Sequence, residues 1–135
     1  MRVEINLPIK AYSVNAYFYG NRSIKTKEAR AYEALVLHLL EDYKQLHDMA
    51  DIWRESGGYF SIDICVEYPQ HIYYNKSGKI SAKTFDVTNV EKPLVDLVMN
   101  RFMDVDDKNL TSMCSSKRPG PMHSVRIILE LHAQT

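Results

Sequence analysis

The sequence predicts an α+β protein in which two main helices pack on a mixed β-sheet, giving two layers. Three observations support this prediction: segments in which apolar and polar residues alternate, segments with apolar residues at helical spacing, and the order of these segments. Alternation with a period of two is typical of half-buried strands, and apolar steps of three and four residues are typical of amphipathic helices. The order is β-α-β-loop-α-β-β, which favours helices covering a mixed sheet.

The N-terminal half is expected to contain one strand and one helical segment. Apolar and polar residues alternate over residues 3–7 before Pro8, so a strand is expected there. Residues 9–24 show no clear period and are expected to form a long loop. Thr26 is a suitable N-cap, and the apolar positions that follow predict a helix, whole or broken once, that Gly57–Gly58 stop.

The C-terminal half begins with the clearest strand pattern, over residues 60–68, which Pro69 ends. Residues 70–85 are polar and carry lysines, so a loop or hairpin around Asn75–Gly78 is expected. The remaining elements are expected to be a helix at about Asn89–Met103 that tolerates Pro93 only near its start, a weak strand at Leu110–Cys114, a rigid turn at Arg118–Pro121 and a strand at 125–131.

Length and charge limit the possible classes of protein. The 135 residues suit one domain, spanning residues 1–135, and 17 basic residues balance 17 acidic ones, which argues against a protein that coats DNA by net charge. Residues 31–70 nevertheless carry eight acids and two bases, so the rest of the chain has an excess of bases. If these parts separate in space, the local field can support nucleic-acid binding. For the acidic stretch alone, a solvated helix face is the favoured interpretation.

The chain is expected to be cytoplasmic, with no membrane partner. Its longest apolar run is far too short to span a bilayer, and no basic segment followed by an apolar one opens the chain. Cys65 and Cys114 have no CxxC spacing and no neighbouring ligands. They therefore predict reduced thiols rather than a disulfide or a zinc site.

The segment from Asp86 to Asp107 contains the candidate metal-binding and catalytic residues. Asp86 and Thr88 are two residues apart in a stretch expected to be extended, so their side chains point to one side. Lys92 follows one helical turn beyond Thr88, and the exit of the helix supplies Asp106 and Asp107. If this exit folds back, carboxylates from two segments converge beside a lysine. Such oxygen ligands suit Mg²⁺ or Mn²⁺, which can activate water and stabilise a scissile phosphate.

Acids that flank a helix also have a purely structural interpretation. Thr88 and Glu91 have the spacing of a capping box, and Asp106–Asp107 can be a solvated turn. On the pattern alone, this structural interpretation is the more common one. A third possibility is an interaction module whose acids serve only as caps and turns.

The same segment resembles the RusA family of Holliday junction resolvases. That family's motif is Asp-x-Asp-Asn, a Lys three residues later, an Asp in the helix, an Asp-Asp pair after the helix and a basic residue further along. The matching residues are Asp86, Asn89, Lys92, Asp96, Asp106–Asp107 and Lys117. The N-terminal part is similar too, with a strand ending at Leu7-Pro8, a Ser13-x-Asn15-x-Tyr17 loop and a helix containing Ala31–Tyr32. The resemblance covers most of the chain, with extra length at about residues 45–58.

The resemblance implies a Mg²⁺-dependent endonuclease, with Mn²⁺ able to substitute, that resolves four-way DNA junctions by paired symmetric nicks in recombination and repair. It implies a homodimer, since two identical sites can face two strands, and a phage or prophage origin. It assigns catalysis to Asp86, Lys92 and Asp107, metal binding to Asp86, Asp106 and Asp107, and supporting roles to Thr88 and Asn89.

One departure from the motif concerns Thr88, which stands where the second aspartate is usual. A threonine hydroxyl can hydrogen-bond a metal-bound water but adds no negative charge. The alternative function is therefore a junction-binding protein of the same fold with weakened or lost catalysis. Glu67, Glu91 and Asp106 are the candidates to compensate.

DNA contacts are expected from basic side chains and from the N-terminal loop. The expected phosphate-binding residues are Arg22, Lys25, Lys27, Lys76, Lys79, Lys83, Lys117 and Arg118. Three of them, Lys76, Lys79 and Lys83, are expected to replace the basic residue that the motif places where this chain has Phe85. Asn15 belongs to the N-terminal loop, in which Tyr17 or Phe18 can stack on a base or act as a wedge at the junction.

Overall fold

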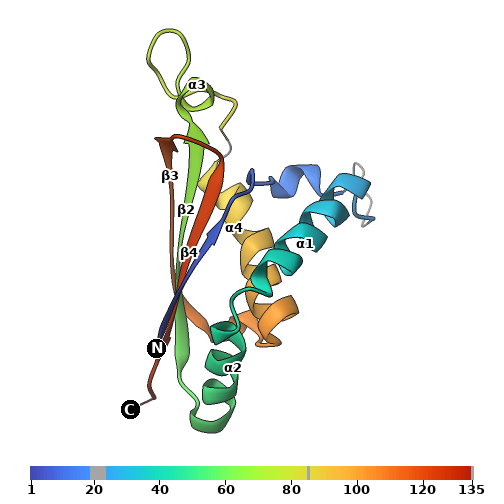
Figure 1. Cartoon of the computed structure of the whole chain (residues 1–135), viewed down its shortest axis with the longest axis vertical. Helices are drawn as coiled ribbons and strands as arrows, with labels where there is room; N and C mark the ends of the chain where they lie inside the picture. Colours follow the sequence, from blue (N-terminus) through green and yellow to red (C-terminus); the bar gives the residue numbers. More distant parts are fainter. Residues whose placement is uncertain (19–23, 85, 135) are drawn as a thin grey trace.

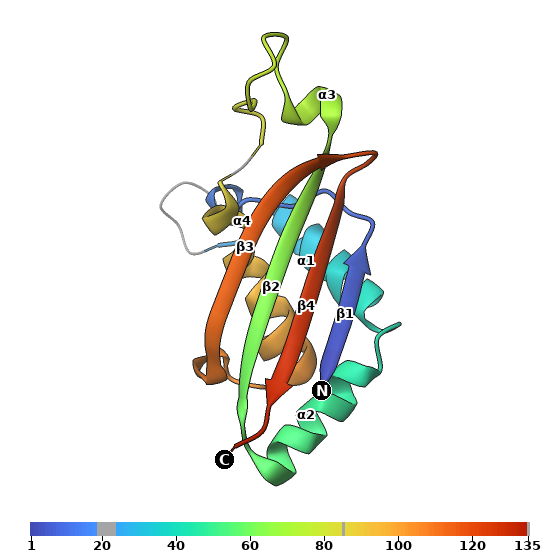
Figure 2. The same cartoon turned by 90° about the vertical axis from the view of Figure 1, so that its left-hand side faces the viewer.

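The sheet has four strands, β1 (Arg2–Leu7), β2 (Tyr59–Pro69), β3 (Leu110–Gly120) and β4 (Ser124–His132), in the order β1-β4-β2-β3. The computed structural model describes residues 1–18, 24–84 and 86–134. β4 runs antiparallel to both β1 and β2, whereas β2 and β3 are parallel. The helices pack on one face of the sheet, and Figure 2 shows the opposite face without a helix. The predicted α+β fold with a mixed sheet is confirmed.

β3 is an edge strand, and it is longer than the sequence predicts. The expected rigid turn at 118–121 is wrong, because Arg118, Pro119 and Gly120 continue the parallel pairing with β2. Pro119 lacks an N–H, which an edge strand tolerates because one side of it needs no ladder partner. The turn to β4 follows at residues 121–123.

The first helical segment consists of two helices, α1 (Lys27–Leu40) and α2 (Gln45–Ser56), separated by one break. Thr26 is the N-cap as predicted, and its Oγ1 accepts a hydrogen bond from the N–H of Ala29 at 3.1 Å. Gly57 ends α2 with a φ of 71°, a conformation that glycine adopts without strain.

The second helix is α4 (Val87–Val95), which continues directly as the π-helix η2 (Asp96–Met103). It begins two residues earlier than expected, so Thr88 lies in its first turn rather than in an extended stretch. Pro93 consequently lies inside the helix and not near its start, where it removes the N–H that would bond to Asn89. Asp104 ends the helix in the left-handed conformation, with φ 57°.

Short elements complete the chain: the 3-10 helices η1 (Val14–Ala16) and η3 (Asp107–Asn109) and the helix α3 (Gln70–Tyr73). The lysine-bearing segment after α3, predicted as a loop or hairpin, forms a hairpin in which Tyr74 pairs with Ile80. We call residues 74–83 the lysine hairpin. Figure 1 shows this hairpin beyond one end of the sheet and α2 near the other. In the described part of the chain, no helix has the length and apolar character needed to cross a membrane.

One hydrophobic core lies between the helices and the sheet. Its sheet side consists of alternate residues of β1, β2 and β4, and its helix side includes Val36, Leu40, Leu94 and Leu97. α4 and η2 therefore hold their polar positions at the margin of this core, facing β3. That margin is where the candidate site lies.

Candidate functional site

Four charged residues of the segment from Asp86 to Asp107 line one pocket of about 350 Å³. The pocket lies between the α4–η2 helix, η3 and the helix-facing side of β3. Its lining residues are Glu91, Lys92, Val95, Asp96, Asp107, Leu110 and Met113. We call it the acid pocket. The predicted convergence of Lys92 with a carboxylate from the helix exit is thus observed for Asp107.

The arrangement of charged residues in the acid pocket depends on helical spacing and on the hydrogen bonds of one amide side chain. Lys92 and Asp96 are four residues apart and so lie on one face of the helix. Asn100, one turn further, donates from Nδ2 to Asp96 Oδ1 at 3.0 Å and accepts at Oδ1 from the N–H of Asp107 at 3.1 Å. Asn100 therefore ties η3 to the helix and positions Asp107. Sequence reasoning missed Asn100, although its spacing from Asp96 was the available signal.

Glu91 contacts β3 instead of capping the helix. The hydroxyl of Ser115 donates a short hydrogen bond to Glu91 Oε2, which joins α4 to the edge strand. The N-cap of α4 is Asp86, so the capping-box interpretation of Thr88 and Glu91 is wrong. Glu91 is consequently an acid of the pocket wall.

Asp86, Thr88 and Asp106 do not line the acid pocket. The carboxylate of Asp86 is exposed and makes no hydrogen bond to the helix N-terminus. Lys92 follows Asp86 by six residues, which corresponds to about 9 Å along a helix. Thr88 is exposed, and Asp106 caps η3 by accepting from the N–H of Lys108 at 2.9 Å. The expected grouping of Asp86 and Asp106 with Asp107 in one place is therefore not what the structure shows.

The chemistry available in the acid pocket is that of carboxylate oxygens beside one ammonium group. Asp96 and Glu91 are half-buried, and Lys92 and Asp107 are exposed. Within the described ranges, no three His, Cys, Asp or Glu side chains are grouped closely enough to hold a metal ion. Asn89, the other motif residue of this turn, is half-buried and donates its N–H to the carbonyl of Asp86 at 2.9 Å.

The predicted phosphate-binding residues fall into two groups. Lys76, Lys79 and Lys83 are exposed on the segment beyond the sheet end. Lys27 is likewise exposed, on α1. Three others are already engaged: Lys117 Nζ donates to Thr84 Oγ1 at 2.9 Å, Lys25 Nζ pairs with Glu33 at 2.9 Å, and Arg118 pairs with Glu67 at 3.2 Å. Arg22 lies outside the described residues.

Charge separates along the long axis of the molecule. The acids of α2 and of the break before it are exposed, as expected for a solvated helix face, and they lie opposite the lysine hairpin. Among the other acids of residues 31–70, Glu33 is buried on α1, and Asp63 and Glu67 are half-buried on β2. The place of Glu33 in the apolar stripe with Ala29, Tyr32 and Val36 was the signal for its burial.

A second, smaller pocket of about 170 Å³ adjoins the first. Its lining residues are Val14, Tyr17, Phe18, Lys25, Glu33, Lys92, Pro93 and Asp96, so it shares Lys92 and Asp96 with the acid pocket. We call it the aromatic pocket. Of the two residues predicted as candidates to stack on a base, Tyr17 is buried and Phe18 is 39% exposed. Asn15 is exposed on η1.

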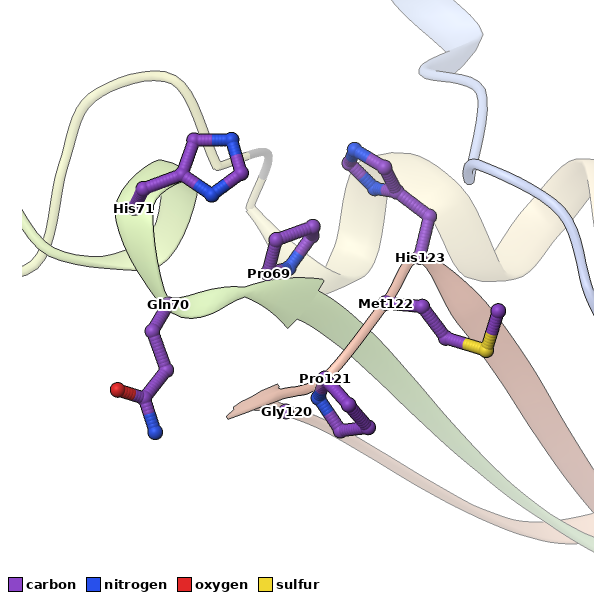
Figure 3. A pocket seen from close by; sticks show the side chains of 7 residues that line it. All are labelled: Pro69, Gln70, His71, Gly120, Pro121, Met122 and His123. Carbon is purple, nitrogen blue, oxygen red and sulfur yellow. The ribbon is translucent and has the colours of Figure 1, made fainter.

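A groove at the end of the sheet contains none of the predicted site residues. It is lined by Pro69, Gln70, His71, Gly120, Pro121, Met122 and His123, and Figure 3 shows the two histidine rings on either side of Pro69. Burial lowers the pKa of His123, and the positive charges of Lys10 and His71 lower this pKa further.

Comparison with protein-family models and with curated proteins finds no match. Among solved structures, the chain is similar to the cell wall anchor of the T6SS from Pseudomonas aeruginosa, at 9% sequence identity and a TM-score of 0.34. The match covers 98% of this chain and 82% of the other. A TM-score of this size supports no inference about fold or function.

Proposed function

We propose that this protein is a Mg²⁺-dependent endonuclease that resolves four-way DNA junctions by paired symmetric nicks. The observation that carries the proposal is the acid pocket, where Lys92 and Asp96 of the second helix meet Asp107 from beyond the helix exit. The resemblance to the RusA family assigns catalysis to Lys92 and Asp107, and these two residues share this pocket. Phage origin and a role in recombination and repair are part of the same proposal.

The acid pocket offers carboxylate oxygens, the ligand type that Mg²⁺ prefers, and this ion is usually held by only one or two protein carboxylates together with waters and substrate phosphates. Of the ligands that the motif implies, Asp107 lines this pocket, whereas Asp86 and Asp106 lie outside it; Asp96 is a carboxylate that the pocket adds. When bound, the ion supplies an activated water and stabilises charge on the phosphate. Lys92 has no ion-pair partner among the described residues, so its ammonium group is available to neutralise a phosphate oxygen.

The lysine hairpin extends the proposed DNA path away from the pocket. Lys76, Lys79 and Lys83 are exposed on one segment, which suits contact with successive phosphates. A second copy of the chain would bring a second pocket to the junction. Two-fold symmetry then accounts for paired nicks.

A junction-binding protein without efficient cleavage is the second candidate. Two observations favour it: Thr88 brings no carboxylate to the exposed first turn of α4, and Asp86 does not line the acid pocket. On this alternative, the hairpin lysines would bind the junction while the acid pocket lacks the charge for a tightly held ion.

The test uses a synthetic four-way junction labelled on each strand in turn, with a linear duplex of the same sequence as the control. The proposed endonuclease nicks two opposite strands at symmetric positions, requires Mg²⁺ or Mn²⁺, and leaves the duplex intact. Junction binding without nicking at any Mg²⁺ concentration selects the second candidate. Failure to bind any branched DNA rejects both.

A further inference from the structure

The aromatic pocket is built by contacts that bring the N-terminal loop against two helices. The N–H of Thr26 donates to the carbonyl of Tyr17 at 2.7 Å, and Thr26 Oγ1 donates to the carbonyl of Ala16 at 3.2 Å. Phe18 forms an antiparallel bridge with Lys25. These bonds hold Tyr17 and Phe18 beside the N-terminus of α1, opposite Pro93 of α4.

Tyr17 presents a buried hydroxyl that has no protein partner in the described part of the chain. The residue is 3% exposed, and its hydroxyl oxygen is buried without a hydrogen bond. Burial raises the pKa of Tyr17, and the neighbouring Tyr32, Glu33 and Asp96 raise it further, so the group stays a neutral donor. Leaving such a hydroxyl unpaired costs free energy, which a ligand that offers a hydrogen-bond acceptor would recover.

Among the described residues that line the aromatic pocket, Lys25, Glu33 and Asp96 already have charged or polar partners, which favours a neutral ligand beside them. Glu33, 7% exposed, pairs with Lys25 at 2.9 Å and with Arg101 at 3.7 Å. Asp96 is held by Asn100. Of the two lysines among the described lining residues, Lys25 is paired with Glu33, and Lys92, which also lines the acid pocket, is the one left to contact a phosphate.

Size and lining restrict the ligand to one flat ring system. The volume of about 170 Å³ is below the range of roughly 300–1,000 Å³ that is usual for drug-sized ligands. Phe18, which is partly exposed, offers aromatic surface on which a base can stack, and the buried Tyr17 lines the pocket beside it. Because Lys92 and Asp96 belong to both pockets, a ring held here lies next to any phosphate held there.

We infer that the aromatic pocket binds a nucleobase unstacked from the DNA strand that is cut, next to the scissile phosphate. This inference rests on the proposed function and adds a base-binding subsite to it. Extruding a base costs least where its pairing and stacking are already disturbed, and the crossover of a junction opened by a bound protein is such a place. Tyr17 donates to the edge of the base, Phe18 covers its face, and Lys92 contacts the adjoining phosphate.

The test measures junction binding in Ca²⁺, so that it does not depend on cleavage. Abasic sites are placed one nucleotide at a time around the crossover, and affinities are measured for wild type, Tyr17→Phe and Tyr32→Phe. Tyr32 is the matched control: its hydroxyl is also buried without a partner among the described residues, but it does not line the pocket. Melting temperatures check that both variants fold, which is expected because each loses only an unpaired hydroxyl.

One abasic position should lower the affinity of wild type about tenfold, the loss expected for one stacked base. Tyr17→Phe should lower affinity for the intact junction about fivefold, and the abasic penalty at that position should shrink in this variant. Tyr32→Phe should behave as wild type. Phe18→Leu, at an exposed site, should reproduce the loss of stacking without disturbing the core.

Two results would overturn the inference. If Tyr17→Phe and Tyr32→Phe bind intact and abasic junctions equally well, the buried hydroxyl has no base partner. If no abasic position affects wild-type binding, no base occupies the pocket. Both results leave the proposed endonuclease intact, because they presuppose a wild type that binds junctions. A wild type that binds no junction overturns the proposed function and this inference together.

Discussion

At the scale of single residues, Lys92 and Asp96 connect the two pockets. They are one helical turn apart, and each lines both the acid pocket and the aromatic pocket. Asn100 continues this face by one more turn and positions Asp107 through its backbone N–H. Three residues at helical spacing therefore set the relation between the proposed phosphate site and the proposed base site.

Asp86→Asn and Asp107→Asn should each lower the nicking rate by orders of magnitude while leaving folding and junction binding nearly unchanged. Both side chains are exposed, so the substitution removes charge and little packing, and metal ligands act together. The measurement is single-turnover nicking at saturating enzyme. The matched control is Asp104→Asn in the same loop, whose left-handed conformation asparagine tolerates. Wild-type nicking by either variant would remove that residue from the site.

Thr88 can be tested without disturbing a helix cap, because Asp86 occupies the N-cap. Thr88→Ala should change stability by less than about 0.5 kcal/mol, as expected for a surface position. Thr88→Asp places a negative charge in the first helical turn, which favours the helix, and should lower the Mg²⁺ concentration for half-maximal nicking. A Mg²⁺ activation curve identical to that of wild type would show that position 88 does not face the ion.

At the scale of elements, sequence periodicity predicted best where one face is buried. β1, β2 and β4 alternate clearly because the core covers alternate side chains. β3 was only half recognised, since an edge strand buries little and its Arg118–Gly120 segment has turn-like composition. The start of α4 was misplaced because Thr88 and Glu91 have the spacing of a capping box, whereas the chain uses Asp86 as the N-cap.

For the candidate site too, the sequence predicted what depends on local pattern and missed what depends on tertiary contacts. The order of the segments predicted that carboxylates would converge beside Lys92 if the helix exit folds back, and the structure brings Asp107 into the same pocket as Lys92. Glu91 contacts Ser115 of β3, and no local pattern reveals that contact. Asp86 remains outside the acid pocket because the helix starts at Val87 and carries Lys92 away from it.

The lysine hairpin is the element that should set the salt dependence of DNA binding. Changing Lys76, Lys79 and Lys83 together to Gln should weaken junction binding and reduce the slope of log affinity against log salt by about 0.9 for each lost phosphate contact. A salt titration by fluorescence anisotropy measures the slope. Lys44→Gln, an exposed lysine just before α2, is the control. An unchanged slope in the triple variant would place the DNA path elsewhere.

At the scale of the whole molecule, the two ends of the sheet lie next to different elements. The lysine hairpin and the groove with His71 and His123 lie near one end, and α2 lies near the other. The acid pocket lies along the edge strand β3. A junction that contacts both the hairpin and the acid pocket would therefore run along one side of the molecule.

The free energy of unfolding should fall at mildly acidic pH through His123. Its folded-state pKa is lowered from the ordinary 6.5, so the unfolded chain binds the proton first and folding loses stability as pH falls through that value. Urea unfolding between pH 8 and pH 5 measures this loss. His123→Gln should flatten the dependence, whereas His38→Gln, at an exposed site on α1, is the control. An equal pH dependence in wild type and His123→Gln would contradict the assignment.

The proposed paired nicks require two pockets in one complex, and mixed dimers test this at the level of the assembly. A cruciform plasmid becomes linear when opposite strands are cut within one binding event, and it becomes a nicked circle when only one is cut. Wild type should yield linear product. Mixing it with excess Asp107→Asn should shift the product toward nicked circles, because most active pockets are then paired with an inactive one. Sedimentation should show a dimer under the same conditions. A product ratio that does not change as the inactive variant is added would mean that each copy of the chain cuts independently, and the paired mechanism would be rejected.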